Sequence, residues 1–261
     1  MMKDNRISVT VADGYRDLTG FVESLPRIFT SSGEVIYRGR NEIRCFRVGG
    51  ETLVVKRFKR LGLFKQMIYS VRSSKASRAY HNAFELLERG VFTPAPVAYV
   101  EVKNCLGLPV DTYYISAYTD MQPVASGLRE GAGNMFNRIL TKDFACFVAT
   151  LHEKGVMHLD LNGTNVVYTP SPEGGASKFG LIDINRMEFA GNEGFPFREC
   201  AANLARFSSL SPLFWYFVDC YVCRRYLPKS AVGIITVEKC RHDSFVNRKK
   251  KLKRQIARKR C

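Results

Sequence analysis

The residues best suited to chemistry lie in one short stretch, His158-Leu-Asp160-Leu-Asn-Gly-Thr-Asn165. A second carboxylate, Asp183, follows eighteen residues after Asn165 in an apolar, strand-like stretch. Transfer of a phosphoryl group from ATP needs a carboxylate to orient the acceptor hydroxyl, and oxygen ligands for the Mg²⁺ ion that bridges the phosphates. The spacing H-x-D-x-x-x-x-N, followed by a strand-borne Asp, supplies both. It predicts Asp160 as the base and Asn165 and Asp183 as the metal ligands.

A cation that could neutralise the phosphates lies upstream, at Lys56 in the β-rich stretch Val54-Val55-Lys56. Each of these features is weak alone, since HxD tripeptides are common and a lysine on an amphipathic strand usually belongs to its solvated face. Together, in this order and with intervening elements of the right kind, they favour a phosphoryl-transfer site over a purely structural reading.

The elements that must position these residues follow from hydrophobic periodicity. In the first half, alternation predicts strands over residues 34–38, 42–48, 52–58, 96–102 and 112–117. Gly49-Gly50 is a two-residue hairpin signal between the second and third of them. A helix is predicted from Lys75 to Arg89, with Gly90 as its stop.

The second half has a different character. Apolar residues recur at helical spacing from Asn134 to Gly155, and two short strands are predicted near residues 166–168 and 179–182. A helical region is expected from about Arg198 to Tyr226. The order indicates an α+β fold of two lobes: a β-rich N-lobe with one helix, a hinge near Tyr118–Pro123, and a reduced, mainly helical C-lobe.

From about residue 30 to residue 226 the chain resembles the protein-kinase-like superfamily, and more narrowly the lipopolysaccharide core kinase family, whose members phosphorylate heptose or Kdo sugars. The stretches that carry the resemblance are Tyr37-Arg-Gly-Arg-Asn41, Val54-Val-Lys-Arg-Phe58, Ser74-Lys-Ala-Ser-Arg78, Gly90-Val-Phe-Thr-Pro94, Leu151-His-Glu-Lys-Gly-Val-Met-His-Leu-Asp-Leu-Asn162 and Ile182-Asp-Ile-Asn-Arg186. The resemblance implies an N-terminal extension (1–29), a kinase-like N-lobe (30–117), a C-lobe (118–238) and a basic tail (239–261).

Several departures from regulated protein kinases bear on the substrate. Ile184-Asn185 stands where those enzymes have Phe-Gly, and Leu159 replaces the Arg that docks an activation-loop phosphate. No Ala-Pro-Glu follows Asp183. Because the peptide-substrate platform and its phospho-switch are both missing, a protein substrate is disfavoured.

The nucleotide loop implied by the resemblance contains a single glycine, Gly39, so phosphate binding there would rely on Arg40 and Asn41 or on backbone groups elsewhere. The family's alignment places a Glu that pairs the strand lysine at a position where this chain has Ala79. Either another acid pairs Lys56, or only the nucleotide holds it. This departure is the strongest argument for a pseudokinase.

The expected function is transfer of a phosphoryl group from ATP, with Mg²⁺, to a heptose or Kdo hydroxyl of the lipopolysaccharide inner core. Two alternatives stay open: a kinase of another small-molecule or glycan acceptor, and a nucleotide-binding pseudokinase scaffold in envelope assembly.

Charge and composition bound the setting. The chain is 46% hydrophobic and 25% charged, which excludes wholesale disorder, and its net charge is +16. Lys239–Cys261 carries 11 Lys and Arg, so we expect peripheral contact with an anionic membrane, and no nucleic-acid motif accompanies it. The first twenty residues lack the apolar core of a secretory signal, and the eight cysteines lack framework spacing. We therefore expect a cytoplasmic protein at the inner face of the cytoplasmic membrane, with a glycolipid substrate.

Overall fold

The computed structural model describes residues 5–58, 73–129, 135–170, 175–191 and 193–258, and it divides into two compact units. Unit 1 comprises residues 1–120 and 181–186, and unit 2 comprises residues 121–180 and 187–261. The segment Leu181–Arg186, which contains Asp183, is therefore part of unit 1, although the chain on both sides of it belongs to unit 2.

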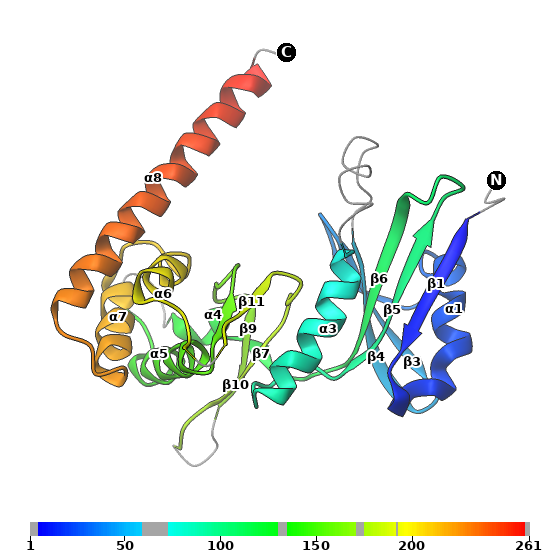
Figure 1. Cartoon of the computed structure of the whole chain (residues 1–261), viewed down its shortest axis with the longest axis horizontal. Helices are drawn as coiled ribbons and strands as arrows, with labels where there is room; N and C mark the ends of the chain where they lie inside the picture. Colours follow the sequence, from blue (N-terminus) through cyan, green and yellow to red (C-terminus); the bar gives the residue numbers. More distant parts are fainter. Residues whose placement is uncertain (1–4, 59–72, 130–134, 171–174, 192, 259–261) are drawn as a thin grey trace. The chain divides into compact units, whose positions relative to one another are not determined.

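Unit 1 is built on a six-stranded antiparallel sheet in the order β1-β5-β6-β4-β3-β2 (Figure 1). Its strands are β1 (Arg6–Val11), β2 (Glu34–Arg38), β3 (Glu42–Val48), β4 (Glu51–Phe58), β5 (Pro96–Lys103) and β6 (Pro109–Ala117). The predicted hairpin is confirmed: Val48 pairs with Glu51 across Gly49 and Gly50, whose φ angles of 60° and 83° suit a tight turn between twisted strands.

The two faces of this sheet are covered by different helices (Figure 1). On one face lie the 3₁₀ helix η1 (Asp13–Leu18) and helix α1 (Thr19–Ile28). Buried side chains from these helices and from the sheet form one hydrophobic core, which includes Val22, Leu25, Phe29, Leu53 and Val55. Since side chains alternate along a strand, burial of Leu53 and Val55 in this core directs Lys56 to the opposite face.

That opposite face is covered by α3 (Lys75–Glu88), the helix predicted from the sequence. The Ser74 side chain accepts a hydrogen bond from the backbone N–H of Ser77, which caps the first turn. Gly90 follows the helix at φ 64°, a left-handed conformation that a helix end favours for glycine. The buried Tyr80 of α3 packs its ring 5.2 Å from that of Tyr99 on β5.

Residues 1–29 were expected to form an extension outside the N-lobe, and here the structure differs. β1 pairs with β5 from Arg6 opposite Lys103 to Val11 opposite Ala98, and α1 fills the core of the same sheet. The physical reason is tertiary: β1 is short, and Pro26 interrupts the α1 pattern, so neither is a strong local signal. Packing against the sheet determines both elements.

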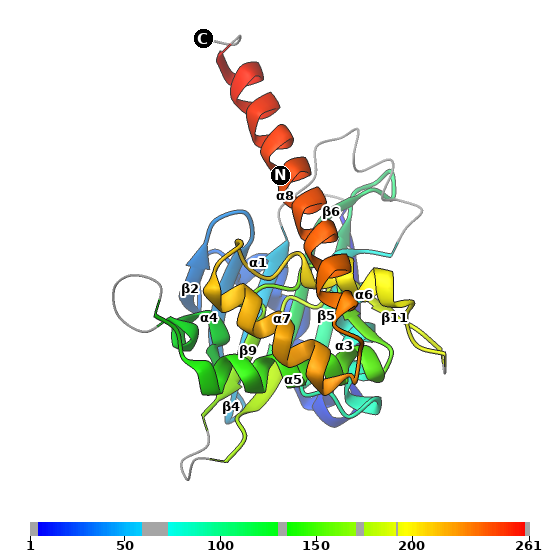
Figure 2. The same cartoon turned by 90° about the vertical axis from the view of Figure 1, so that its left-hand side faces the viewer.

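Unit 2 is mainly helical. Its helices are α4 (Val124–Leu128), α5 (Arg138–Glu153), α6 (Phe197–Leu204), α7 (Pro212–Arg224) and α8 (Ser230–Arg258). Helices α5 and α7 lie side by side (Figure 2), with the Phe144 ring 5.1 Å from that of Phe217. Short strands complete the unit: β7 (Gln122–Pro123), β9 (Val166–Thr169) and β10 (Lys178–Leu181) form one sheet, and β8 (Val156–His158) pairs with β11 (Met187–Phe189).

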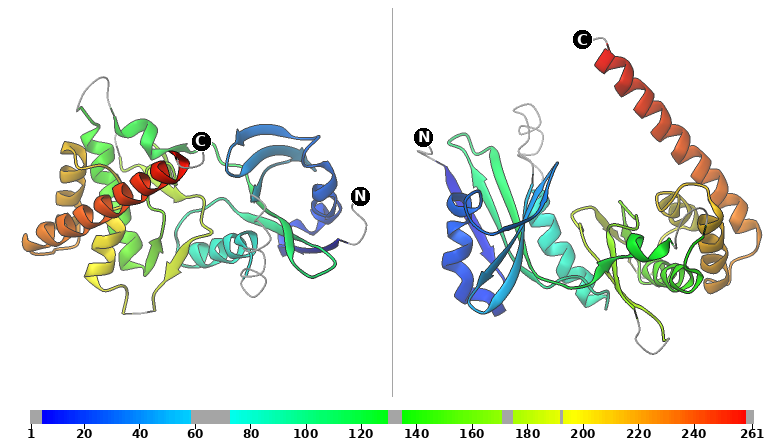
Figure 3. Two further views of the ribbon diagram at one scale, coloured as in Figure 1. Left: turned by 90° about the horizontal axis from the view of Figure 1, so that it is seen from above. Right: turned by 180° about the vertical axis from the view of Figure 1, so that it is seen from behind.

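The predicted boundary of the basic tail at residue 239 falls inside a continuous helix. α8 packs against α6 and α7 through its first turns, where Ala231, Ile235 and Lys239 are buried, and its C-terminal half extends past those helices (Figure 3). Lys239 was expected to contact a membrane, but only 3% of it is exposed, and its Nζ donates to the carbonyl of Ala205. Among the described residues, no helix is both long and apolar enough to span a bilayer.

Candidate active site

The first pair of predicted site residues meets within unit 1. Lys56 on β4 lies opposite Tyr114 of β6, on the α3 side of the sheet. Its Nζ is 2.6 Å from Oδ1 of Asp183, with the lysine side chain 13% exposed and the aspartate side chain 35% exposed. The structure therefore joins the lysine expected at the phosphates to a carboxylate expected at the metal.

Asp183 has an uncommon backbone conformation. Its φ of 55° lies in the left-handed region, which Asp tolerates better than most residues. The amide Nδ2 of Asn185 donates to Oδ1 of Asp183 at 2.5 Å, so the same oxygen receives both Asn185 and Lys56. These contacts fix the direction of the carboxylate.

The segment that carries Asp183 is tied to unit 1 by backbone carbonyls. Its first residue, Leu181, accepts from the buried Thr93 hydroxyl at 2.8 Å. Asn82 of α3 donates through Nδ2 to the carbonyl of Ile184 at 2.7 Å, and Arg78 donates through Nε to that of Asn185 at 3.2 Å. Helix α3 thus holds the two residues that follow Asp183 through hydrogen bonds to their backbone carbonyls.

Ala79, at the position of the absent Glu, is buried in α3 with 2% of its surface exposed. The structure answers which acid pairs Lys56: it is Asp183 itself. Helix α3 contributes to this region through Arg78 and Asn82, which hold backbone, rather than through a carboxylate.

The predicted nucleotide-loop residues connect β2 and β3. The backbone N–H of Gly39 donates to the carbonyl of Asn41 at 3.0 Å, which closes a tight turn with Arg40 exposed at its tip. Burial lowers the pKa of Lys75 in the first turn of α3, and the positive charge of Arg40 lowers it further. The turn is therefore coupled electrostatically to the N-terminal end of α3.

The second pair of predicted site residues lies in unit 2. Asp160 is exposed, and its backbone carbonyl accepts from Nδ2 of Asn165 at 2.9 Å and from Nδ2 of Asn162 at 3.0 Å. Its backbone N–H donates to Nδ1 of His158 at 3.1 Å. Side chains of the loop therefore hold its backbone by hydrogen bonds, and Asp160 itself is exposed to solvent.

Beneath this loop lies a buried hydrogen-bond network. Asn203 on α6 donates through Nδ2 to the carbonyl of His158 at 2.8 Å, so its Oδ1 accepts from Nε2 of His152 at 3.2 Å. Nδ1 of His152 then accepts from the Tyr221 hydroxyl at 2.7 Å, and that oxygen accepts from Arg225 at 2.9 Å. His152, His158 and Asn203 therefore have structural roles at the base of the loop.

Burial lowers the pKa of His152 to about 4, with a smaller contribution from the nearby Arg225 and an opposing one from the Asn203 hydrogen bond. His152 is therefore neutral near pH 7 and serves as a fixed link between α5, α6 and α7.

The structure thus brings together Lys56 with Asp183 in one unit, and Asp160 with Asn165 in the other. Sequence reasoning missed the residues that hold the Asp183 segment, namely Arg78, Asn82 and Thr93. A signal was present for two of them. Lys75, Arg78 and Asn82 recur at helical spacing beside the alanine face of α3, which marks a polar stripe on one side of that helix.

A sheet unit with a Lys–Asp pair and a helical unit with an HxDxxxxN loop define the class of the protein as a kinase-like phosphotransferase. The model of the lipopolysaccharide kinase (Kdo/WaaP) family matches residues 59–211, more than half of the chain. The chain belongs to this family. The matched range includes Asp160, Asn165 and Asp183 and starts just after Lys56.

A structure of WaaP in complex with acyl carrier protein has a similar fold, with a TM-score of 0.62 and 16% identity, covering 91% of this chain and 98% of that one. The PknI kinase domain of Mycobacterium tuberculosis, a double mutant, gives a TM-score of 0.41 at 12% identity, covering 75% and 76%. Among curated proteins, none has a matching sequence.

The predicted fold class and family are confirmed, and the activity follows from the family. The protein is a phosphotransferase that acts on a sugar hydroxyl, a kinase of the lipopolysaccharide core.

Proposed function

We propose that the protein transfers the terminal phosphoryl group of ATP to a heptose or Kdo hydroxyl of the lipopolysaccharide inner core. The observation that carries the proposal is the contact between Lys56 and Asp183, because it joins two residues far apart in sequence that phosphoryl transfer requires at one nucleotide. Lys56 would stabilise the negative charge of the phosphates. Gly39, Arg40 and Asn41 would form the loop that contacts them.

The chemistry of each proposed ligand suits a divalent cation. Asp183 in unit 1 offers a carboxylate and Asn165 in unit 2 offers an amide oxygen, and oxygen is the ligand that Mg²⁺ prefers. Both described contacts of the Asp183 carboxylate are made by Oδ1, which leaves Oδ2 as the oxygen that a metal ion would take. When bound, Mg²⁺ would offset negative charge on the transferring group.

Asp160 would do the proton chemistry. Its exposed carboxylate would accept a hydrogen bond from the sugar hydroxyl and take its proton as the oxygen attacks the terminal phosphorus. The bond from that phosphorus to the bridging oxygen breaks, and ADP leaves. The hydrogen bonds of His158, Asn162 and Asn165 to the Asp160 backbone support a fixed direction for this group.

Two variants test the assignment. Asp160→Ala and Asp183→Ala should each abolish phosphate transfer to purified inner-core oligosaccharide while the chain stays folded. Asp160→Ala should still bind Mg·ATP, because the metal ligands remain, whereas Asp183→Ala should bind it poorly. Full transfer by Asp160→Ala would exclude it as the base. Acceptors that carry heptose alone or Kdo alone then identify the sugar.

A second function, a nucleotide-binding scaffold without catalysis, is favoured by one observation, the buried Ala79 in place of a lysine-pairing acid. The two functions differ in one measurement. A wild-type protein that binds ATP yet transfers nothing to inner-core oligosaccharide, or to other glycans, would support the scaffold. Lys56→Met should weaken nucleotide binding in both cases, and unchanged affinity would contradict the role of Lys56.

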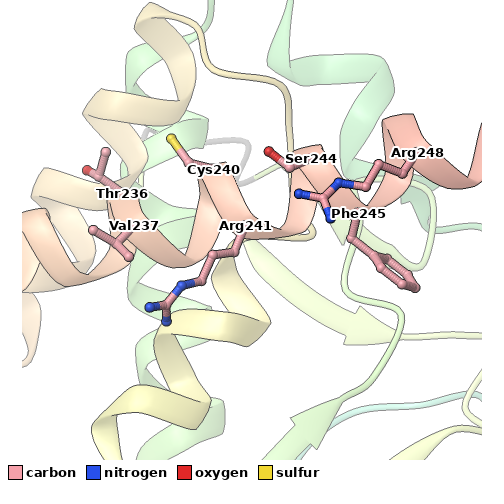
Figure 4. Close-up of a pocket in the computed structure, with 7 residues that line it drawn as sticks. All are labelled: Thr236, Val237, Cys240, Arg241, Ser244, Phe245 and Arg248. Atoms are coloured by element: carbon pink, nitrogen blue, oxygen red, sulfur yellow. The ribbon is translucent and has the colours of Figure 1, made fainter.

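We further propose that the protein works at the inner face of the cytoplasmic membrane, held there by α8. A pocket lies along this helix, lined by Thr236, Val237, Cys240, Arg241, Ser244, Phe245 and Arg248 (Figure 4). Val237, Phe245 and Leu252 are 49%, 64% and 57% exposed, and arginines alternate with them along the same face. Such a face suits binding to anionic lipid headgroups, and each basic residue near the membrane surface contributes about 1 kcal/mol to the free energy of binding.

Vesicle sedimentation tests this surface. The full chain should bind anionic vesicles and not neutral ones, and binding should weaken steeply with salt. A chain that ends at Asp243 keeps the 2.8 Å ion pair between Lys239 and Asp243. It therefore removes the exposed part of α8 but leaves the turns that pack against the rest of unit 2. Equal binding by both chains would contradict the proposal. Acyl carrier protein is the partner of WaaP in its solved complex. Added to the same assay, it tests whether a protein competes with the vesicles for α8.

A further inference from the structure

Besides Lys56, four cations of unit 1 interact electrostatically in the region of Asp183, and they come from three parts of the chain. Arg40 lies in the turn between β2 and β3, Lys75 and Arg78 lie in the first turn of α3, and Arg186 ends the Asp183 segment. The first turn of α3 contains no acidic residue.

Lys75 is the centre of this group. Burial lowers its pKa first, and Arg40, Arg78 and Arg186 lower it further, while Asp183 acts in the opposite direction. Of these four charged groups only Asp183 is negative, and Arg78 is also hydrogen-bonded to the carbonyl of Asn185, two residues after Asp183.

Lys75 is also a neighbour of the strand lysine. Its Nζ lies 5.9 Å from the centre of the Phe58 ring, and Nζ of Lys56 lies 5.3 Å from the same centre. Two ammonium groups thus share one aromatic ring, although Asp183 already pairs with Lys56. Helix α3 brings a cation here rather than the Glu whose position Ala79 occupies.

Arg78 cannot leave this cluster easily. Nε donates to the carbonyl of Asn185 at 3.2 Å and Nη1 to that of Ser73 at 3.0 Å. Both partners are neutral, so the hydrogen bonds fix the position of the guanidinium without cancelling its charge. Lys75 and Arg78 are half-buried, whereas Arg40 and Arg186 are exposed. Like charges held partly out of solvent destabilise a protein unless an anion relieves them, and the N-terminal end of α3 adds partial positive charge.

We propose that Lys75 is a second phosphate-binding lysine of this kinase, which contacts the terminal phosphates of the nucleotide alongside Lys56, with Arg40, Arg78 and Arg186 completing the cationic site. The proposal rests on the function proposed above and deepens it. It also accounts for a nucleotide loop with a single glycine, since side-chain cations would replace backbone N–H groups as partners of the phosphates.

The test measures binding of a non-hydrolysable ATP analogue, ADP and AMP, each with Mg²⁺, by calorimetry on the full chain. Lys75→Met should lose about 10- to 100-fold in affinity for the analogue, the range for one charge-assisted contact, less for ADP, and nothing for AMP. Lys75→Arg should restore most of the loss. The control is Lys103→Met, because Lys103 ends β5 in a surface pair with Glu101.

Each result decides something. Wild-type affinity of Lys75→Met for all three nucleotides overturns the inference, and so does an equal loss for AMP and the analogue, which indicates a structural role. If Lys75→Met fails to fold, Arg40→Met at an exposed turn tests the same cluster by the same readout. If the wild type binds no nucleotide, the proposed function fails. Inorganic tripolyphosphate is then the probe, and its failure to bind would overturn the inference too.

Discussion

The carboxylates of Asp160 and Asp183 lie in surroundings of different charge. Asp160 follows a strand whose carbonyl is bound by a buried, uncharged network of Asn203, His152 and Tyr221. The Asp183 carboxylate is contacted by the ammonium of Lys56 as well as by the Asn185 amide, and the half-buried Arg78 donates to the carbonyl of Asn185. The surroundings of Asp160 are thus uncharged, whereas those of Asp183 are cationic.

This difference matches what each group must do in phosphoryl transfer. A base must point in one direction and keep an exposed, available carboxylate, which neutral bonds to the backbone can ensure without competing for it. A nucleotide site must attract several negative charges, which only a field of cations can do. We therefore expect breaks in the neutral network to reduce stability, and breaks in the cation cluster to reduce nucleotide affinity.

The largest effect on stability is expected for Asn203→Leu. This change leaves Nε2–H of His152 unpaired in the interior and removes the hydrogen bond from Asn203 to the carbonyl of His158, so the free energy of unfolding should fall by about 4 kcal/mol. Urea denaturation measures it. Asn247→Leu, an exposed site on α8, is the matched control and should be nearly neutral. A loss in Asn203→Leu as small as in the control would mean that the network does not hold the loop.

The second effect is a pH dependence. His152 has a pKa of about 4 when folded, below the ordinary value of 6.5, so the unfolded chain takes up its proton first as pH falls. The contribution is complete above pH 6.5 and is lost progressively toward pH 4, about 3 kcal/mol in all. Urea denaturation across this range should show that the free energy of unfolding depends less steeply on pH for His152→Gln than for wild type. The exposed His81→Gln should keep the wild-type slope, and identical slopes for all three proteins would contradict the assignment.

The residues of the candidate site, Lys56, Asp160, Asn165 and Asp183, could be proposed from the sequence because their types and order are those that phosphoryl transfer needs. Their immediate surroundings were harder to predict. A polar stripe on α3 is visible in the sequence, but its partners are backbone carbonyls about a hundred residues away, and a carbonyl has no side-chain signature.

The fold shows the same limit. The hairpin at Gly49-Gly50 and the helix from Lys75 were predictable because their signals are local. β1 and α1 were not, because a short strand and a helix containing Pro26 gain their stability from the sheet they cover. The partner of Lys56 was equally beyond prediction, since Asp183 reaches it only through the path of the segment Leu181–Arg186.

The smallest effect distinguishes the charge of Arg78 from its hydrogen bonds. Arg78→Lys keeps the charge but loses the hydrogen bonds of the guanidinium to the carbonyls of Asn185 and Ser73. If charge is what the nucleotide needs, its affinity should change by no more than about threefold, while the free energy of unfolding falls by about 1 kcal/mol. Arg78→Met should show the same loss of stability and a much larger loss of affinity. Equal affinities for the Lys and Met variants would mean that Arg78 only tethers the Asp183 segment, and the cluster would then bind phosphate through Lys75, Arg40 and Arg186 alone.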